Sequence, residues 1–392
     1  MRRTITFISL LGALWLSACG GRQTATAPTA TPVPSPTPAP RTLVIWHPFS
    51  GAEEQTLEQW RLNFEAQNPR VDVQLHAYPA AELFDAFAAA VQSGAGPDIL
   101  LGPATWSGTL AERGWLAPVP WNTYDALTNF ILQPLSYAAR WNDDTFGVPF
   151  SVEVGTLYYN RALLHTPPDT YTELLEQART VGLLVVPTFA ATSGLYFTDG
   201  GPETLGGDWL TRAGAEAYLE GVQQLSEQAG VTFGDDWARF TAGEAGLLLA
   251  SSDDYPALSA ALGNDLGVAS PPMFMPHPWR ALARSVVAMQ SINATSAAQE
   301  TSDLFWRYML TADAQTLWFE RTGHTPINVT GLPMPLYAAW QRTLDDAITP
   351  PPTLETAEAT LPALDAAVQA VSLEGASVAD AAEALMAAQP KR

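Results

Sequence analysis

Residues 42–75 read TLVIWHPFSGAEEQTLEQWRLNFEAQNPRVDVQL, and this stretch decides the fold. Its first five residues form an apolar run that is typical of a buried strand. Apolar residues then recur at helical spacing over 57–64, after Ser50, which has the spacing of a capping box with Glu53. Residues 71–75 alternate between apolar and polar side chains, which predicts a second strand.

Strand and helix patterns keep alternating beyond this stretch. The spacing of apolar residues predicts a helix over 80–92, and the run DILL predicts a buried strand over 98–101. Three strands separated by two helices imply right-handed crossovers and a largely parallel sheet, so the predicted fold class is α/β. Further strands are predicted at 146–159, 183–187, 246–250, 266–269 and 283–289, and further helices at 104–113, 171–181, 211–230, 295–310, 312–321, 335–347 and 378–388.

Residues 1–19 have the pattern of a signal peptide. Arg2 and Arg3 precede an apolar run over 5–16, which is shorter than the about 20 residues that cross a bilayer. The sequence LSAC, which ends at Cys19, resembles the lipobox of bacterial lipoproteins. That resemblance implies cleavage before Cys19 and a diacylglycerol on its sulfur, so we expect a lipid anchor there. An ordinary signal peptide with an incidental cysteine is the alternative.

Residues 20–40 read GGRQTATAPTATPVPSPTPAP and hold almost no apolar side chain that a core could bury. We expect this Thr/Pro-rich segment to be a disordered, extended tether. Cys19 is the only cysteine in the chain, which excludes an intramolecular disulfide and any CxxC site. The 352 residues that follow the tether exceed the usual size of a single core, so two lobes are predicted.

The net charge of the chain limits the classes of molecule that it can bind. The formal net charge is −21, and residues 41–392 carry −24 because the first 40 residues hold three arginines and no acid. This argues against nucleic acid and anionic lipid surfaces as partners, and it permits neutral sugars. The five histidines are scattered and no HExxH, GxSxG or P-loop motif occurs, so we expect no metal and no cofactor.

Four further segments, together with residues 42–74, resemble a known protein family. In chain order they resemble extracellular solute-binding proteins of the sugar type (family 1), the group that includes maltodextrin-binding proteins. The similarity covers most of residues 42–345. The segments are GAGPDILLGPATWSGTLAERGWLAPV (94–119), FGVPFSVEVGTLYYNRALL (146–164), FTAGEAGLLLASSDDY (240–255) and LTADAQTLWFERTGHTPINVTG (310–331).

The resemblance implies a specific architecture. The family has a two-lobed, type II periplasmic-binding-protein fold, in which crossing strands join the lobes and a ligand cleft lies between them. We therefore expect lobe 1 to comprise 41–150 plus 268–323, and lobe 2 to comprise 151–267 plus 324–392. Ligand binding at the carboxyl ends of the strands is also the general rule for open α/β sheets.

The resemblance also implies which residues contact the ligand. Relatives often carry a charged pair where this chain has Thr105 and Trp106, and this departure puts the maltodextrin subgroup in question. Glu153 matches a ligand-accepting glutamate at the lobe junction; a structural ion pair with an arginine is the alternative. Asp253 stands near a family tryptophan, and it or its neighbour could instead cap the next helix. The full predicted set is Trp46, His47, Thr105, Trp106, Glu153, Tyr196, Asp253, Trp279, Arg280 and Trp340.

These features together predict a binding lipoprotein and not an enzyme. It would act as a monomer outside the cytoplasm, capture a carbohydrate by lobe closure, and deliver it to the permease subunits of an ABC importer. Its only contact with the membrane would be the lipid on Cys19. One alternative is a binding protein for glycerol-phosphate-type or polyol solutes, for which Arg280 would hold the phosphate. A surface-anchored glycosidase and a sensor lipoprotein are the others.

Overall fold

The computed structural model describes residues 40–131, 133–188, 210–272, 281–345, 347–350 and 353–390. The signal peptide, Cys19, the tether up to residue 39, Tyr196, Trp279 and Arg280 lie outside these residues. The chain from Pro40 onward forms one compact unit, and the fold described below is that of this unit.

The first sheet has six strands in the order β13-β6-β12-β3-β1-β2. Strand β1 pairs in parallel with β2 and β3, as the strand–helix–strand pattern predicts. The prediction of a largely parallel sheet is wrong for the other half, where β12 pairs antiparallel with both β3 and β6. In the chain, β12 follows Leu266–Ala269, a strand of the second sheet, so the strand–helix–strand pattern of residues 42–101 does not set its direction. The strands are β1 (Arg41–His47), β2 (Val71–Ala77), β3 (Ile99–Pro103), β6 (Gly147–Glu153), β12 (Arg284–Gln290) and β13 (Thr325–Pro326).

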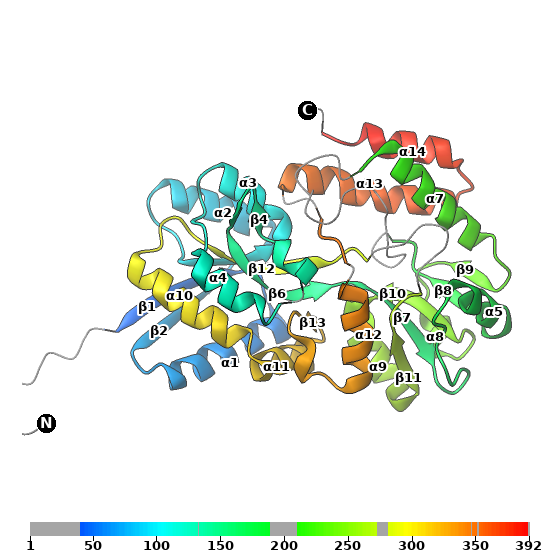
Figure 1. Cartoon of the computed structure of the whole chain (residues 1–392), viewed down its shortest axis with the longest axis horizontal. Helices are drawn as coiled ribbons and strands as arrows, with labels where there is room; N and C mark the ends of the chain where they lie inside the picture. Colours follow the sequence, from blue (N-terminus) through cyan, green and yellow to red (C-terminus); the bar gives the residue numbers. More distant parts are fainter. Residues whose placement is uncertain are drawn as a thin grey trace, which may run out of the picture. The chain divides into compact units, whose positions relative to one another are not determined.

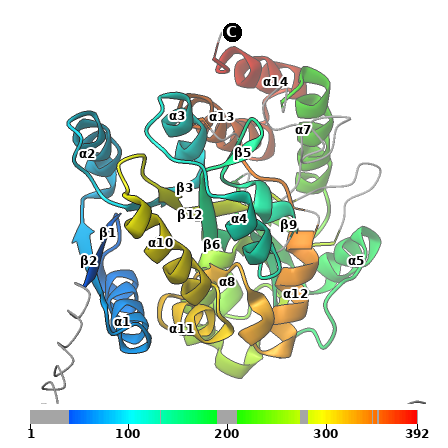
Figure 2. The ribbon, with the colours of Figure 1, turned by 60° about the vertical axis from the view of Figure 1, so that its left-hand side comes forward.

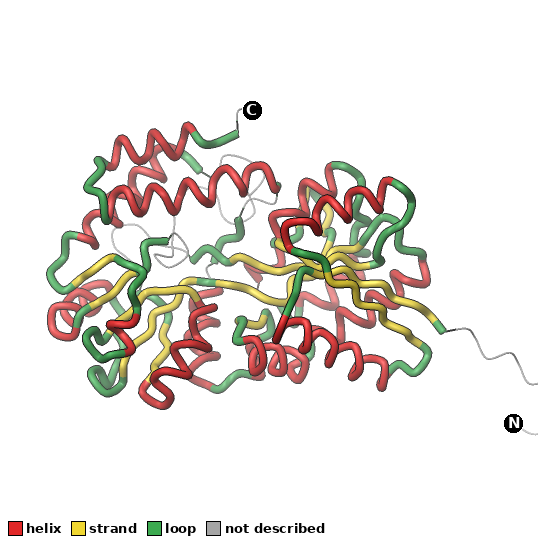
Figure 3. Tube along the Cα trace, turned by 180° about the vertical axis from the view of Figure 1, so that it is seen from behind, coloured by secondary structure: helices red, strands yellow, loops and turns green. Residues whose placement is uncertain are grey.

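The second sheet has five strands in the order β11-β7-β10-β8-β9. Strands β6 and β7 are separated by Val154 alone, so the chain passes from one sheet to the other within a single residue. Seen from behind, strands run between the two groups of helices (Figure 3). The strands are β7 (Gly155–Asn160), β8 (Leu183–Val185), β9 (Val231–Phe233), β10 (Leu247–Ser251) and β11 (Leu266–Ala269), and a separate hairpin joins β4 (Arg140–Trp141) to β5 (Asp144–Thr145).

Helices surround both sheets (Figure 1). Around the first sheet lie α1 (Gly51–Gln67), α2 (Ala80–Gln92), η1 (Ala104–Trp106), α3 (Ser107–Glu112), α4 (Trp121–Thr128), η2 (Gln133–Tyr137), α10 (Ser296–Met309), α11 (Ala312–Thr322) and η6 (Val329–Gly331). Around the second lie α5 (Tyr171–Val181), α7 (Arg212–Ser226), α8 (Ala238–Thr241), η4 (Ser252–Asp254), α9 (Tyr255–Leu262), η5 (Gly263–Asp265), α12 (Met334–Asp345), α13 (Leu354–Ser372) and α14 (Val378–Ala387). Among the described residues, no helix combines the length and the apolar character that crossing a bilayer requires.

Two local expectations need correction. Ser50 is the N-cap of α1, but its side chain makes no capping hydrogen bond. Glu53 is therefore free of the predicted capping box, and its carboxylate contacts His324 instead. Helix α13 was not predicted, because Pro362 interrupts an otherwise helical pattern and proline usually ends a helix.

Helix α13 connects the two halves of the unit. It packs beside α7 and α14, and its first residue reaches α3, where the backbone N–H of Leu354 donates to Oγ1 of Thr109 at 2.9 Å. Figure 2 shows α13 beside α3. The lobe boundaries predicted from the sequence stay a prediction. The strands show only that residues 147–153, 284–290 and 325–326 share the first sheet.

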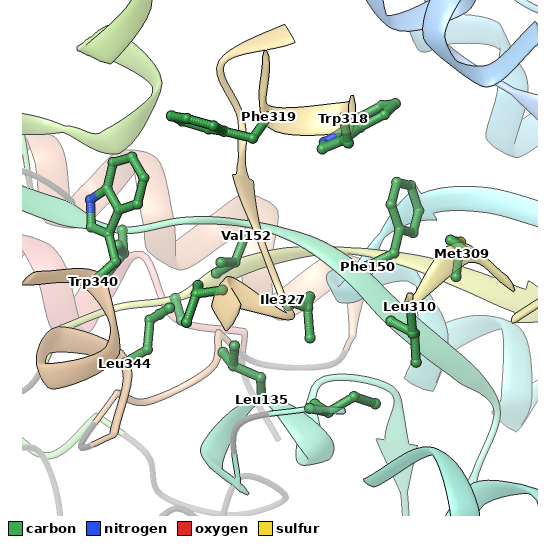
Figure 4. Close-up of a cluster of buried hydrophobic side chains, with 14 of the residues drawn as sticks. Leu135, Phe150, Val152, Met309, Leu310, Trp318, Phe319, Ile327, Trp340 and Leu344 are labelled. Atoms are coloured by element: carbon green, nitrogen blue, oxygen red, sulfur yellow. The ribbon is translucent and has the colours of Figure 1, made fainter. Parts of the chain in front are cut away.

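A continuous apolar core lies under the crossing from β6 to β7. Val152 is buried at its centre (Figure 4), where Trp318 and Phe319 of α11 lie on one side and Leu135 on the other. The rings of Trp318 and Phe150 are 5.5 Å apart and meet edge to face. Because this core contains residues of both sheets, the sheets are joined by packing as well as by the chain.

Candidate functional site

A pocket of about 180 Å³ opens where the two sheets meet. It is lined from the first sheet by the end of β6 and the start of β12, and from the second by the end of β10 and the segment after β8. Helix α13 closes another side. Polar groups from two sheets therefore face one small space, as is general for ligand sites in α/β proteins. The lining residues are Glu153, Val186, Thr188, Ser251, Asp254, Leu282, Arg284, Leu361 and Asp365.

Glu153 is the centre of the polar contacts in this pocket. It lies directly opposite Arg284 on the neighbouring strand, and its Oε1 accepts hydrogen bonds from the Arg284 guanidinium and, at 2.7 Å, from Oγ of Ser251. The side chains of Glu153 and Arg284 remain 22% and 42% exposed. Among the described residues Oε2 of Glu153 has no hydrogen-bond donor, so it can accept from a ligand hydroxyl. The ion pair with an arginine, which the sequence left open as the alternative to a ligand role, is therefore present. Both of its members line the pocket.

Asp254 is the helix-capping member of the acidic pair at residues 253–254. Its Oδ2 accepts from the backbone N–H of Ser251 at 3.1 Å, and with Ser251 it completes a capping box at the start of η4. Burial raises the pKa of Asp254, and the nearby charges of Asp253 and Glu153 add to this effect, while the bond from Ser251 opposes it. The expected capping role is therefore confirmed for one of the two aspartates.

Asp253 points to a different partner. Its Oδ1 accepts from Nδ1 of His324 at 3.1 Å, and the other ring nitrogen of His324 donates to Oε1 of Glu53 at 3.0 Å. The hydrogen bonds from Asp253 and Glu53 raise the pKa of His324 to about 10, so the ring is an imidazolium at neutral pH. We call Glu53, His324 and Asp253 the ion cluster. It adjoins the pocket through Ser251, whose Oγ accepts from the backbone N–H of Asp253 at 3.1 Å.

Two predicted residues at the end of β1 pack within the first sheet and do not line this pocket. Trp46 is half-buried, and its ring lies 4.4 Å from that of Tyr78. His47 is buried, and its Nδ1 accepts from the backbone N–H of Phe49 at 3.3 Å. Burial lowers the pKa of His47, although Glu54 and Glu53 act in the opposite direction. A neutral, buried ring follows from this position.

The two predicted residues after β3 lie in η1, also outside the pocket lining. Thr105 is half-buried, and Trp106 is buried over Gly102, where an added Cβ would come within 2.7 Å of the indole ring. The Phe84 ring contacts Trp106 edge to face at 5.3 Å. Packing against α2 and β3 therefore accounts for Trp106.

Trp340 belongs to the set predicted to contact a ligand, and the structure places it in the core. It has no exposed surface, its Nε1 donates to Oγ1 of Thr156 at 3.2 Å, and the rings of Tyr255 and Phe319 lie 5.7 Å and 5.6 Å away. Trp340 lies on the side of α12 that faces α9 and α11, so its ring is enclosed by their side chains. In this structure the indole has no ring face to offer a ligand.

Sequence reasoning missed several residues of the pocket. Arg284 is a charged residue beside an apolar strand, but the strand register that makes it the partner of Glu153 cannot be read from the local sequence. Leu361 and Asp365 belong to the unpredicted helix α13. Within the described ranges, no group of His, Cys, Asp or Glu side chains is arranged to hold a metal ion.

Comparisons with known proteins extend this description. Residues 59–343 match the sequence profile described as bacterial extracellular solute-binding protein. A 138-residue stretch is 29% identical to the maltotriose-binding protein of Pyrococcus abyssi, and it spans 34% of this chain and 29% of that protein's length.

Solved structures share the fold over almost the whole chain. An extracellular solute-binding protein from Staphylococcus aureus in complex with maltose superposes with a TM-score of 0.74 at 16% identity, covering 90% of this chain and 97% of that one. The maltose-maltodextrin binding protein of Alicyclobacillus acidocaldarius superposes with a TM-score of 0.64 at 21% identity, covering 89% and 99%. These likenesses confirm the two-lobed, type II periplasmic-binding-protein fold. With most of its length inside the matched profile, the chain belongs to the bacterial extracellular solute-binding proteins, a family of extracytoplasmic binding proteins and not of enzymes.

Proposed function

We propose that the protein binds a sugar of the maltose or maltodextrin type in the pocket around Glu153 and delivers it to the permease of an ABC importer. The observation that carries this proposal is the joint placement of Glu153, Ser251 and Arg284 where the two sheets meet. Sugar hydroxyls both donate and accept hydrogen bonds, and bonds to ionised partners are the strong ones. The relatives from Pyrococcus abyssi and Staphylococcus aureus, described as binding maltotriose and maltose, support the same ligand class.

Lobe closure would couple binding to transport. Because Arg284 belongs to the first sheet and Ser251 to the second, a ligand in the pocket contacts both halves at once. A ligand that makes its full set of contacts only in a closed state shifts the equilibrium toward that state. In this proposal the lobes are 41–150 plus 268–323 and 151–267 plus 324–392, and the closed monomer docks on the permease.

The same proposal places the protein on the outer face of a membrane. Cys19 would carry the lipid, and residues 20–40 would span at most about 60 Å at the about 3 Å per residue of an extended Pro-rich chain. Expressing the full chain and its Cys19→Ala variant, then separating membranes from soluble fractions, tests the anchor. The wild type is expected with the membranes and the variant in the soluble fraction. Equal partitioning of the two would reject the anchor.

Arg284 makes a phosphate ester worth testing as a second ligand class. Against it, the described lining holds three carboxylates, those of Glu153, Asp254 and Asp365, and a single guanidinium that Glu153 already engages. A doubly charged phosphate would meet net repulsion in such a space. The pocket charge therefore favours a neutral sugar over glycerol phosphate.

Isothermal titration of the purified full chain tests the sugar proposal. The ligands are maltose, maltotriose, a polyol and glycerol 3-phosphate. Maltotriose is expected to bind, and Glu153→Gln is expected to weaken it by roughly tenfold to a hundredfold, since a hydrogen bond to an ionised group is lost. Glu112→Gln, on the exposed end of α3, is the matched control and should bind as the wild type does. Binding of glycerol 3-phosphate in preference to every sugar would overturn the proposal.

A further inference from the structure

The ion cluster links elements that belong to different halves of the unit. Glu53 lies in the first turn of α1, which packs against the first sheet, and Asp253 lies in η4, directly after strand β10 of the second sheet. His324 stands between them in the short turn from α11 to β13. Its two ring nitrogens donate to the two carboxylates at 3.0 Å and 3.1 Å. One side chain therefore ties α1 to the turn that borders the pocket.

The cluster sits in a tightly packed part of the molecule. Gly323, which precedes His324, has φ of +76°, and an added Cβ would come within 1.8 Å of Cγ of Pro256 in α9. The ring of Tyr255 lies 5.4 Å from that of Phe319 in α11, and the Trp318 ring stacks on His324 at 6.1 Å. Close approach of α11 and α9 therefore holds His324 in place, and only a glycine allows that approach.

A chain of hydrogen bonds runs from the ion cluster to the pocket. The backbone N–H of Asp253 donates to Oγ of Ser251, and this hydroxyl donates to Oε1 of Glu153. A hydroxyl has only one hydrogen, so a fixed donor at its lone pair helps to direct that hydrogen to Glu153. The next residue, Ser252, is bonded to Val154 in both directions, at 2.8 Å and 3.1 Å, which ties the η4 turn to the strand crossing.

The positive charge of His324 holds two carboxylates together in the ion cluster. Glu53 and Asp253 both face the imidazolium of His324, and His47 lies near Glu53 while Asp254 lies near Asp253. Without the positive ring, carboxylates from α1 and η4 would face each other with no cation between them. Such repulsion would move η4, and with it Ser251, away from α1.

We propose that His324 is a positioning residue for ligand binding: by bridging Glu53 and Asp253 it fixes the η4 turn, and through Ser251 it orients Glu153 in the pocket. The ligand readout of this inference rests on the proposed function. His324 itself lies outside the pocket lining and acts through its neighbours.

The first experiment compares maltotriose affinity of the wild type and His324→Gln at pH 7.5 in low and high salt. In low salt the variant is expected to bind roughly tenfold more weakly, the size of one lost bond between charged groups. Its affinity should partly recover as the NaCl concentration rises from about 0.02 M to about 1 M, because salt screens the repulsion between the carboxylates of Glu53 and Asp253. The wild type should show no such recovery. A residue with a merely structural role would lower the melting temperature without this salt dependence.

A rescue variant sharpens the test. In the triple variant Glu53→Gln, Asp253→Asn, His324→Gln the charges are gone while amide hydrogen bonds remain available. It is expected to bind within about threefold of the wild type at both salt concentrations, since no unpaired charge is left. Weak binding by the single variant that neither salt nor the triple change restores would overturn the inference.

A measurement without sugar separates this inference from the proposed function. Hydrogen exchange at the amides of Ser251, Ser252 and Asp253 is expected to speed up by roughly tenfold in His324→Gln, because the turn loses its fixed contact. His165→Gln, an exposed site, is the control. If the wild type binds no sugar, the proposed function fails, and faster exchange would still support the positioning of η4. Unchanged exchange in folded His324→Gln would reject that positioning.

Discussion

Oγ of Ser251 lies 2.7 Å from Oε1 of Glu153, and this hydrogen bond joins the ends of strands that belong to two different sheets. Glu153 is the last residue of β6, and Ser251 is the last residue of β10. The polar groups at the centre of the pocket thus lie at the ends of two strands. Small changes in how the sheets meet would act directly on these polar groups of the pocket.

Arg284→Ala should weaken sugar binding more than it weakens the fold. It leaves Glu153 with one donor fewer in the pocket wall, while the pair is exposed enough that its loss should lower the free energy of unfolding by no more than about 1 kcal/mol. Urea unfolding and titration with maltotriose measure the two effects. The control is Arg41→Ala, which breaks a surface pair with Glu300 and should change neither quantity. A large loss of stability with normal binding would contradict the expected role.

Trp340→Ala should lower the free energy of unfolding by about 3–5 kcal/mol, because it opens a cavity in the core. Trp340→Phe should cost less and leave sugar affinity unchanged, since the ring does not line the pocket. Trp121→Ala is the control, because that side chain is 75% exposed and should contribute no more than about 0.5 kcal/mol. Loss of sugar binding in a stable Trp340→Phe protein would contradict the core role and support the predicted ligand contact.

Stability should fall as the pH rises toward 10. The pKa of His324 is raised to about 10, above its ordinary value of 6.5, so its contribution is complete below the ordinary value and is lost as the pH passes through the raised one. Since the cluster is about one-third exposed, the loss should be on the order of 1–2 kcal/mol after solvent screening. Urea unfolding between pH 6 and 10 checks this against His324→Gln, in which this component should be absent. Parallel curves for the two proteins would contradict it.

Gly323→Ala should destabilise the protein more than Gly375→Ala does. Both glycines have positive φ, +76° and +72°, but an added Cβ at Gly323 meets Pro256 whereas nothing lies within 4 Å at Gly375. Strain at positive φ costs about 1 kcal/mol at either position, and the clash at Gly323 should add about 1–3 kcal/mol. Thermal unfolding of the two variants measures the difference, and equal melting temperatures would show that α9 moves away without cost.

Local periodicity was enough to predict many elements. The helices over 80–92 and 171–181 and the strand over 266–269 have the predicted bounds, because their apolar spacing is regular and glycine or proline lies nearby. Helix α13 was missed because a local rule about proline was overridden by packing against α7 and α14. The antiparallel pairing of β12 was also missed, since strand direction depends on where the chain comes from.

The site was only partly predictable for the same reason. Glu153 was predicted from the resemblance of residues 146–164 to a segment of the sugar-binding family, and it lines the pocket. Its partner Arg284 is 131 residues away, and Glu53 and His324 are 271 residues apart, so no sequence window contains either pair. Tyr196, Trp279 and Arg280 lie outside the described residues, and their ligand roles stay predictions.

Val154 alone separates β6 from β7, and it is completely buried. A residue contributes only two soft torsions, φ and ψ, so this connection offers a narrow choice of relative rotations. The β-branched side chain in a packed environment narrows that choice further. If the protein works by the proposed lobe closure, such a crossing would act as a stiff pivot that brings the same pair of strand ends back to the same register on every cycle of capture and release.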